Sequence, residues 1–149
     1  MWKYKSNDFN NISLHDNFIE IIQISNETIK LCFNDGFNIV KTHPLNNTGK
    51  SKHTGNAILK LESAKFSNGQ VFSSENNNRM IDLNTVFKDL THFEVLKFEW
   101  NKSISMFYLF GNLTNNQFHN DFCELTFICD NASFYWNDYI QDAWFENWP

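Results

Sequence analysis

Residues 18–33 read FIEIIQISNETIKLCF and contain the pattern that decides the fold. Residues 18–24 are almost continuously apolar, which is typical of a strand with apolar side chains on both faces. The polar triplet Ser-Asn-Glu at 25–27 then predicts a hairpin turn. Residues 29–33 alternate between apolar and more polar side chains, so we expect a returning strand that buries one face.

The same alternation recurs along most of the chain, with glycine- and asparagine-rich turns between the apolar runs. This pattern predicts a mainly β protein of the α+β kind, forming a single domain over residues 1–149. We expect roughly 7–9 strands in an antiparallel sandwich, or in a curved sheet with one face covered by a helix. Besides the hairpin, strands are expected at 2–5, 37–40, 57–66, 96–100, 104–110 and 123–129, with 134–136 extending the pairing.

Two segments have helical spacing instead, which predicts one or two short helices. Apolar residues recur every three or four positions over 81–90. Residues 138–149, DYIQDAWFENWP, place Asp138, Asp142 and Glu146 four apart, on one face of a second short helix. Residues 42–56 have the composition of a long loop, and 73–79 form a polar stretch that we expect to be exposed.

The composition limits the kinds of partner that the protein can bind. The net charge is −5 and Arg79 is the single arginine, both of which disfavour a nucleic acid. No apolar run reaches about 18 residues, so no membrane span is expected. The first residues contain no apolar signal region, and the three cysteines form no C-x-x-C pair. We therefore expect a cytoplasmic protein with reduced thiols.

The charge is divided unevenly along the chain. Residues 1–80 carry nine Lys and Arg against seven Asp and Glu, or about +2. Residues 81–149 carry three Lys against ten Asp and Glu, or about −7. An asymmetry of this kind indicates association with a basic partner, and the alternative is a solvated acidic face with no partner.

Reaction chemistry is not indicated by any motif. His15-Asp16 is the clearest polar pair, and it would suit acid–base chemistry or a metal. Adjacent residues of an extended chain point to opposite faces, however, so a polar turn is the favoured interpretation. Cys123 and Cys129 are in phase with apolar neighbours and are expected to be buried. The other histidines have no ligand spacing, so no catalytic residue, metal or cofactor is expected.

The C-terminal segment combines carboxylates with aromatic rings. One short helix cannot bury Trp144, Phe145 and Trp148 together, so we expect at least one ring at a surface groove or at a contact with another molecule. The alternative is that these rings cover the open end of the sheet. The predicted partner-binding residues are Asp138, Asp142, Trp144, Phe145, Glu146 and Trp148.

Three features are shared with a recurring type of small bacterial protein. Leu14-His15-Asp16 precedes a strand hairpin, a strand ending in Cys129-Asp130 is followed by Trp136, and an aromatic, acidic segment closes the chain. In these features the chain resembles uncharacterised β-rich bacterial families, some of which look like immunity proteins encoded beside toxins. The resemblance implies a toxin-neutralising protein and assigns no catalytic residue.

These observations lead to the first hypothesis, that the chain is a non-enzymatic, cytosolic protein-binding domain. In its specific form, this hypothesis predicts an immunity protein that covers a basic toxin domain. The second hypothesis is a small-ligand-binding or enzymatic β domain with a pocket near His15, Asp16 and residues 42–56. A homo-oligomer that uses the same aromatic residues is the third.

Overall fold

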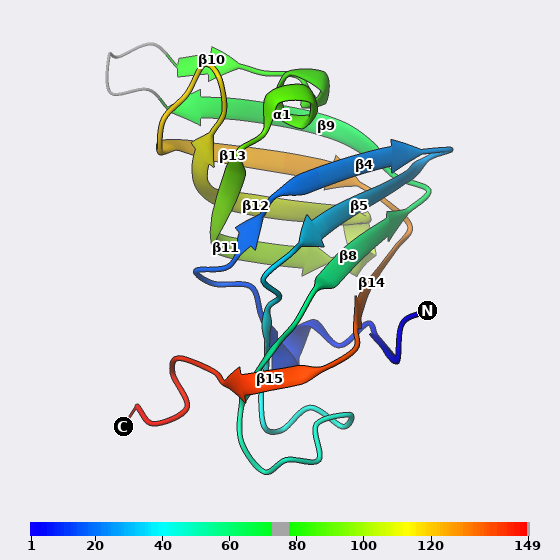
Figure 1. The fold of residues 1–149 in the computed structure, drawn as a ribbon. Coiled ribbons are helices and arrows are strands. Elements are labelled where there is room, and N and C mark those ends of the chain that lie inside the picture. The colour runs from blue at the N-terminus through cyan, green and yellow to red at the C-terminus, as the bar shows by residue number, and fades with distance from the viewer. Residues whose placement is uncertain (73–77, 149) are drawn as a thin grey trace.

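The computed structural model describes residues 1–72 and 78–148, and its strands form three antiparallel sheets. The two larger sheets face each other, and the smallest lies at one end of the pair (Figure 1). The five-stranded sheet contains, in spatial order, β1 (Tyr4–Ser6), β14 (Asn131–Trp136), β8 (Ala57–Glu62), β5 (Thr28–Phe33) and β4 (Ile21–Ser25).

The second large sheet has six strands, and the small sheet has four. The six-stranded sheet contains β10 (Asn78–Met80), β9 (Lys65–Phe72), β13 (Asp121–Ile128), β12 (Met106–Thr114), β11 (His92–Asn101) and β3 (Phe18–Ile19). The small sheet contains β15 (Tyr139–Asp142), β7 (Lys52–Thr54), β6 (Asn38–Ile39) and β2 (Ile12–Ser13). The helical elements are α1 (Leu83–Asp89) and the short 3₁₀ turns η1 (Phe9–Asn11) and η2 (Lys102–Ile104).

Residues 18–33 form strands of both large sheets. The predicted hairpin is confirmed: β4 pairs with β5 across Asn26 and Glu27, whose positive φ angles suit a tight two-residue turn. The prediction of one continuous strand over 18–24 is wrong. β3 pairs with β11 in the six-stranded sheet, and after Glu20 the chain continues as β4 in the five-stranded sheet. This step closes one side of the sandwich.

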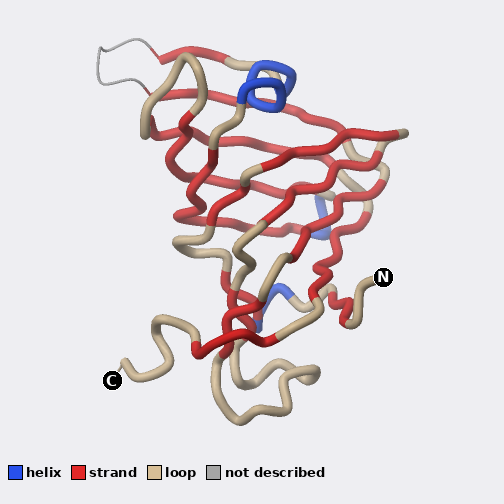
Figure 2. The backbone as a smooth tube through the Cα atoms, in the orientation of Figure 1, coloured by secondary structure: helices blue, strands red, loops and turns tan. Residues whose placement is uncertain are grey.

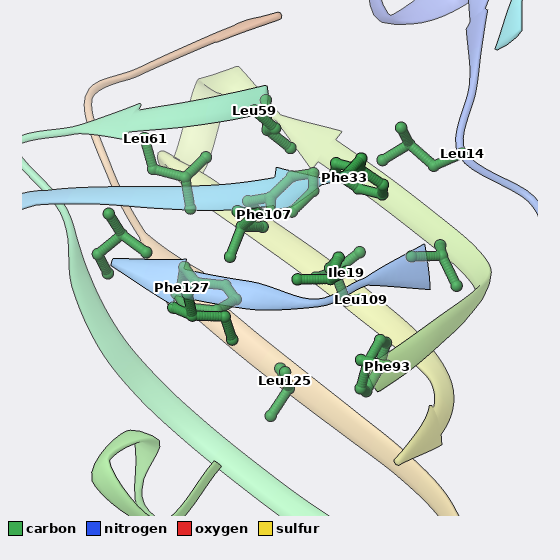
Figure 3. Packing of buried hydrophobic residues seen from close by; sticks show 14 of the residues in the cluster. Leu14, Ile19, Phe33, Leu59, Leu61, Phe93, Phe107, Leu109, Leu125 and Phe127 are labelled. Atoms are coloured by element: carbon green, nitrogen blue, oxygen red, sulfur yellow. The ribbon is translucent and has the colours of Figure 1, made fainter. Parts of the chain in front are cut away.

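The core lies between the two large sheets (Figure 3). Leu59, Leu61 and Phe33 project from the five-stranded sheet, and they are fully buried. Side chains of the six-stranded sheet meet them from the other side. Each such burial contributes about 1.5–3 kcal/mol relative to exposure. The facing residues labelled in Figure 3 are Ile19, Phe93, Phe107, Leu109, Leu125 and Phe127.

A bulge at Leu96 changes which residues of β11 face this core. Val95 lies opposite Gly111 of β12 and Lys97 lies opposite Phe110, so Leu96 is an extra residue in the ladder. Before the bulge Phe93 and Val95 are buried, and after it Phe98 packs on the core. A one-residue insertion reverses the alternation, because side chains alternate with a period of two.

The fold class is confirmed as mainly β with sandwiched antiparallel sheets, but the strand number is not. The described residues form fifteen strands rather than seven to nine, because several expected strands and loops are divided between sheets. The expected helix at 81–90 is present as α1, with Val86 buried. Within the described residues, no helix is both long and apolar enough to span a membrane.

Two loop predictions are also modified. Residues 42–56 contain β7, and the side-chain amide of Asn46 holds this segment by donating to the carbonyl oxygens of Ile39 (3.1 Å) and Lys50 (2.9 Å). Of the polar stretch expected at 73–79, residues 73–77 lie outside the described residues and the rest belongs to β10.

The predicted C-terminal helix is wrong. Tyr139–Asp142 is the strand β15, and the chain after it is drawn as loop (Figure 2). Turns follow, in which the amides of Glu146 and Trp148 donate to the carbonyls of Ala143 and Phe145. An isolated helix of this length is marginal in water, whereas β7 offers a strand edge with which the segment pairs.

Candidate functional site

The C-terminal segment is fixed to residues 50–52 by backbone and side-chain contacts that we call the latch. Asp142 accepts a hydrogen bond from Lys52 Nζ at 2.7 Å, and Lys50 Nζ lies 3.8 Å from the same carboxylate. The amide of Ala143 donates to the carbonyl of Ser51 at 2.9 Å. The Ser51 amide in turn donates to the carboxylate of Glu146. The latch therefore joins segments about ninety residues apart in sequence.

The latch uses two carboxylates that the sequence analysis assigned to a partner. The hydrogen bond from Lys52, with the charges of Lys52 and Lys50, lowers the pKa of Asp142. Glu146 is bonded to backbone rather than turned to solvent. Asp138, by contrast, is exposed, and its backbone carbonyl accepts from Gly55. The three acidic residues therefore do not share one face, because the segment that carries them is not a helix.

The three rings beyond β15 pack mainly on each other. Trp144 lies edge-on to Phe145, with ring centroids 5.3 Å apart, and edge-on to Trp148 at 5.1 Å. Trp144 is 47% exposed and Trp148 is 69% exposed, while Phe145 is half-buried. We call these three residues the aromatic cluster. It is held by the latch at its base and presents two indole rings to solvent.

A hollow of about 260 Å³ adjoins the aromatic cluster. It brings together the C-terminal segment, the His15-Asp16 region and the turn before Gly36, which come from three separate parts of the chain. The sequence analysis had treated the first two as separate candidate sites. The residues lining this hollow are Asp16, Asn17, Phe18, Asp35, His53, Gln141, Asp142 and Trp144.

His15 connects this hollow to the edge of the six-stranded sheet. Its Nδ1 lies 2.8 Å from the carbonyl oxygen of Leu96, the bulged residue of β11, and must donate a proton to it. Its Nε2 lies 3.4 Å from Asp16, and its ring centroid is 6.3 Å from Trp144. In the neutral ring Nε2 then carries no proton, so an ion pair with Asp16 requires the doubly protonated imidazole.

Two carboxylates at or next to this hollow are unpaired within the part of the chain that the structure describes. Within the described residues, the side chains of Asp35 and Glu20 make no hydrogen bond or ion pair. A second hollow of about 340 Å³ continues the first, since both are lined by Phe18 and Asp35, and it also includes Glu20 and His92. Sequence reasoning missed Phe18, Glu20 and Asp35, because no local pattern shows that residues 18–20 and the turn at Asp35 line adjoining hollows.

The remaining histidines do not form a shared site. His53 Nδ1 lies 2.8 Å from Asn38 Oδ1, and its Nε2 contacts the backbone carbonyl of Asp35. His43 is buried and packs edge-on against Trp136. In the described part of the chain, no three His, Cys, Asp or Glu side chains are arranged to hold a metal ion.

Ser6 and His43 form a pair with the spacing of a nucleophile and its base. Ser6 Oγ lies 2.8 Å from His43 Nε2. The backbone amide of Leu45, however, donates to His43 Nδ1 at 3.0 Å. Nδ1 is therefore the unprotonated nitrogen, and Nε2 donates to Ser6 rather than accepting its proton. This arrangement suits a structural hydrogen bond between the first strand and residues 42–56.

The three cysteines are buried free thiols, as expected for Cys123 and Cys129. Burial, with a smaller contribution from Glu124, raises the pKa of Cys123 to about 12. Burial and Asp130 raise the pKa of Cys129 to about 11. A nucleophilic thiolate requires the opposite shift, so these side chains serve as small apolar groups of the core.

No protein-family model, no curated protein and no solved structure matches this chain. The geometry of its own side chains is therefore the basis for assigning a function.

Proposed function

We propose that this protein is a non-catalytic binding domain that engages a basic protein partner, as an immunity protein engages a toxin. The observation that carries this proposal is the aromatic cluster: two indole rings stand in solvent on a segment that the latch holds in place. Large exposed aromatic residues on an ordered scaffold are typical of binding hot spots, because they supply contact area at low conformational cost.

The hollow beside Trp144 supports a partner with basic side chains. Asp16 and Asp35 line it, and the carboxylate of Asp35 has no internal partner among the described residues. A lysine or arginine side chain that entered between these carboxylates would gain charge-assisted hydrogen bonds, and its apolar stem would lie against Trp144. Asp16 and Asp35 thus join the carboxylates expected from the sequence to steer a basic partner, namely Asp138, Asp142 and Glu146. Asp142 also lines this hollow, but its charge is paired with Lys52.

The small-ligand alternative has less support from the site. The hollow beside Trp144, of about 260 Å³, is smaller than the range of about 300–1,000 Å³ common for small-molecule pockets, and the second hollow, of about 340 Å³, is near the lower end of that range. The ring nitrogens of His53 are engaged by Asn38 and by the Asp35 backbone.

The unpaired thiols suit a reducing compartment, so we propose that the interaction takes place in the cytoplasm.

The proposal is tested by co-purification of the tagged protein from its native cell, followed by affinity measurement with the recovered partner. We expect Trp144→Ala to weaken binding by about 2 kcal/mol or more, close to thirtyfold, and Asp35→Lys to weaken it in a salt-dependent manner. Ile104→Ala is the matched control, because Ile104 is 59% exposed and lies outside the site. For the immunity form, co-expression with the protein should rescue growth that the partner inhibits.

Two results would count against this function. One is equal affinity for the wild-type protein, Trp144→Ala and Ile104→Ala. The other is a recovered partner that binds without any dependence on salt, which would exclude the carboxylates of the hollow from the interface.

A further inference from the structure

The outer face of the six-stranded sheet carries aromatic rings that do not belong to the core. Tyr108 and Phe110 of β12 and Phe122 of β13 alternate with fully buried residues, so they point away from the five-stranded sheet. In Figure 1 the strands β11, β12 and β13 lie behind β4, β5 and β8, and the outer face is turned away from the viewer. Phe122 is 51% exposed, and its neighbours on this face are half-buried.

The strand register places two carboxylates beside these rings. Glu124 lies directly opposite Phe110, while Asn112 lies between Glu94 on one side and Phe122 on the other. The rings of Phe110 and Phe122 are 5.6 Å apart and nearly parallel. Glu124 therefore lies beside Phe110, and Glu94 lies across Asn112 from Phe122, on the strands on either side of β12. Lys97 of β11 lies directly opposite Phe110.

Both carboxylates are oriented by neighbouring side chains. The hydroxyl of Tyr108 donates to Glu124 Oε2 at 3.1 Å, and the amide of Asn112 donates to Glu94 Oε1 at 3.3 Å. Burial, together with the bond to Glu124, raises the pKa of Tyr108, so the phenol remains a donor at neutral pH. The second oxygen of each carboxylate has no hydrogen bond within the described residues and can accept one from outside.

We propose that this face is a second docking surface, for a cationic protein segment whose arginine or lysine side chain lies over Phe110 and Phe122 between Glu94 and Glu124. Aromatic rings attract cations, and the open oxygen of each fixed carboxylate can accept a charge-assisted hydrogen bond from a guanidinium or ammonium group. A second copy of the chain fits less well, because stacking this face on itself would oppose Glu94 and Glu124 to their counterparts. The lysine nearest to the phenylalanine pair, Lys97, is already paired with Glu99 at 3.2 Å.

A ten-residue arginine peptide is the probe for this surface, with its affinity measured by isothermal titration. The double variant Glu94→Gln/Glu124→Gln should bind it about tenfold more weakly than the wild-type protein. The matched control is Glu27→Gln/Asp130→Asn, which removes the same charge from two exposed positions outside the face. We expect the control to change the affinity by less than about twofold.

Apolar variants separate this surface from the aromatic cluster. Phe122→Ala should weaken peptide binding by about fivefold both in the wild-type protein and in the Trp144→Ala background, whereas Ile104→Ala should leave it unchanged. Equal loss in the two double variants would overturn the proposal, because net charge alone would then explain binding. Loss only in Trp144→Ala would overturn it as well. A dimer in light scattering that Phe122→Ala dissociates would show instead that a second copy covers the face.

Discussion

Trp136 and Trp148 are separated by only eleven residues, yet the first is fully buried and the second is 69% exposed. Trp136 ends β14, which lies between β1 and β8, and its ring packs on Tyr4 and Phe37. Trp148 follows β15, an edge strand of the small sheet, and its ring packs on Trp144. An aromatic residue is buried when other segments cover its ring. Phe37 and His43 cover Trp136, while the C-terminal segment leaves Trp148 without such a cover.

Substituting one aromatic residue from each region gives the largest expected contrast in stability. Phe127→Ala leaves a cavity between the two large sheets and should lower the free energy of unfolding by about 3–5 kcal/mol. Trp148→Ala removes an exposed ring and should change it by less than about 0.5 kcal/mol. Guanidinium unfolding curves measure both values. A cost for Trp148→Ala close to that of Phe127→Ala would mean that the aromatic cluster is part of the core.

The next contrast lies within the latch. Lys52→Met removes the ammonium group 2.7 Å from Asp142, and we expect the amide of Ala143 to exchange its hydrogen at least about fivefold faster, with global unfolding unchanged. Lys50→Met is the matched control, because that ammonium group lies 3.8 Å away and is more exposed. Equal exchange rates in the two variants would show that the backbone pairing of β15 holds the segment without the ion pair.

Strong acid should release the latch. The pKa of Asp142 in the folded protein lies below its ordinary value of 3.8, because the charged carboxylate accepts a hydrogen bond from Lys52. Between these two values the unfolded chain binds more protons, so the stabilisation is complete above pH 3.8 and is lost as the pH falls through the lowered pKa. Tryptophan emission at decreasing pH would report this release, and Asp142→Asn should remove the transition.

His43 gives the smallest expected effect on the free energy of unfolding, and it tests the buried region of the comparison. Burial lowers the pKa of His43 below 6.5, and the charge of Asp8 opposes this in part. The unfolded chain then binds more protons below pH 6.5, so the free energy of unfolding should fall as the pH decreases from about 7.5 to about 5.5. His43→Gln should flatten this slope. An unchanged slope would assign the pH dependence to other groups.

The strands were predicted best where alternation and turn chemistry agree, as in the hairpin at 21–33. The break at Glu20 and the bulge at Leu96 could not be predicted, because each depends on a neighbouring strand that is distant in sequence. The C-terminal segment shows the same limit, since its four-residue spacing of acidic groups suggested a helix and β7 determined a strand.

The candidate site was predicted only in its parts. His15, Asp16 and Trp144 were all singled out in the sequence, but nothing there places the ring of His15 6.3 Å from that of Trp144. The division of charge between the halves of the chain also predicted the acidic surface only in part. Each large sheet contains strands from both halves, and Lys52 neutralises Asp142 across the latch. The position of the acidic surface therefore depends on which carboxylates remain unpaired in the folded protein.

By itself, the sequence determined the mainly β class, the hairpin, the short helix near 81–90 and the burial of Cys123 and Cys129, because these follow from local periodicity and turn chemistry. The tertiary structure alone decided the division of strands among three sheets, the pairing of the C-terminal segment with β7, and which aromatic and acidic groups remain available. The physical reason is that burial and charge neutralisation are properties of contacts between distant segments, and a one-dimensional pattern contains no information about which segments meet.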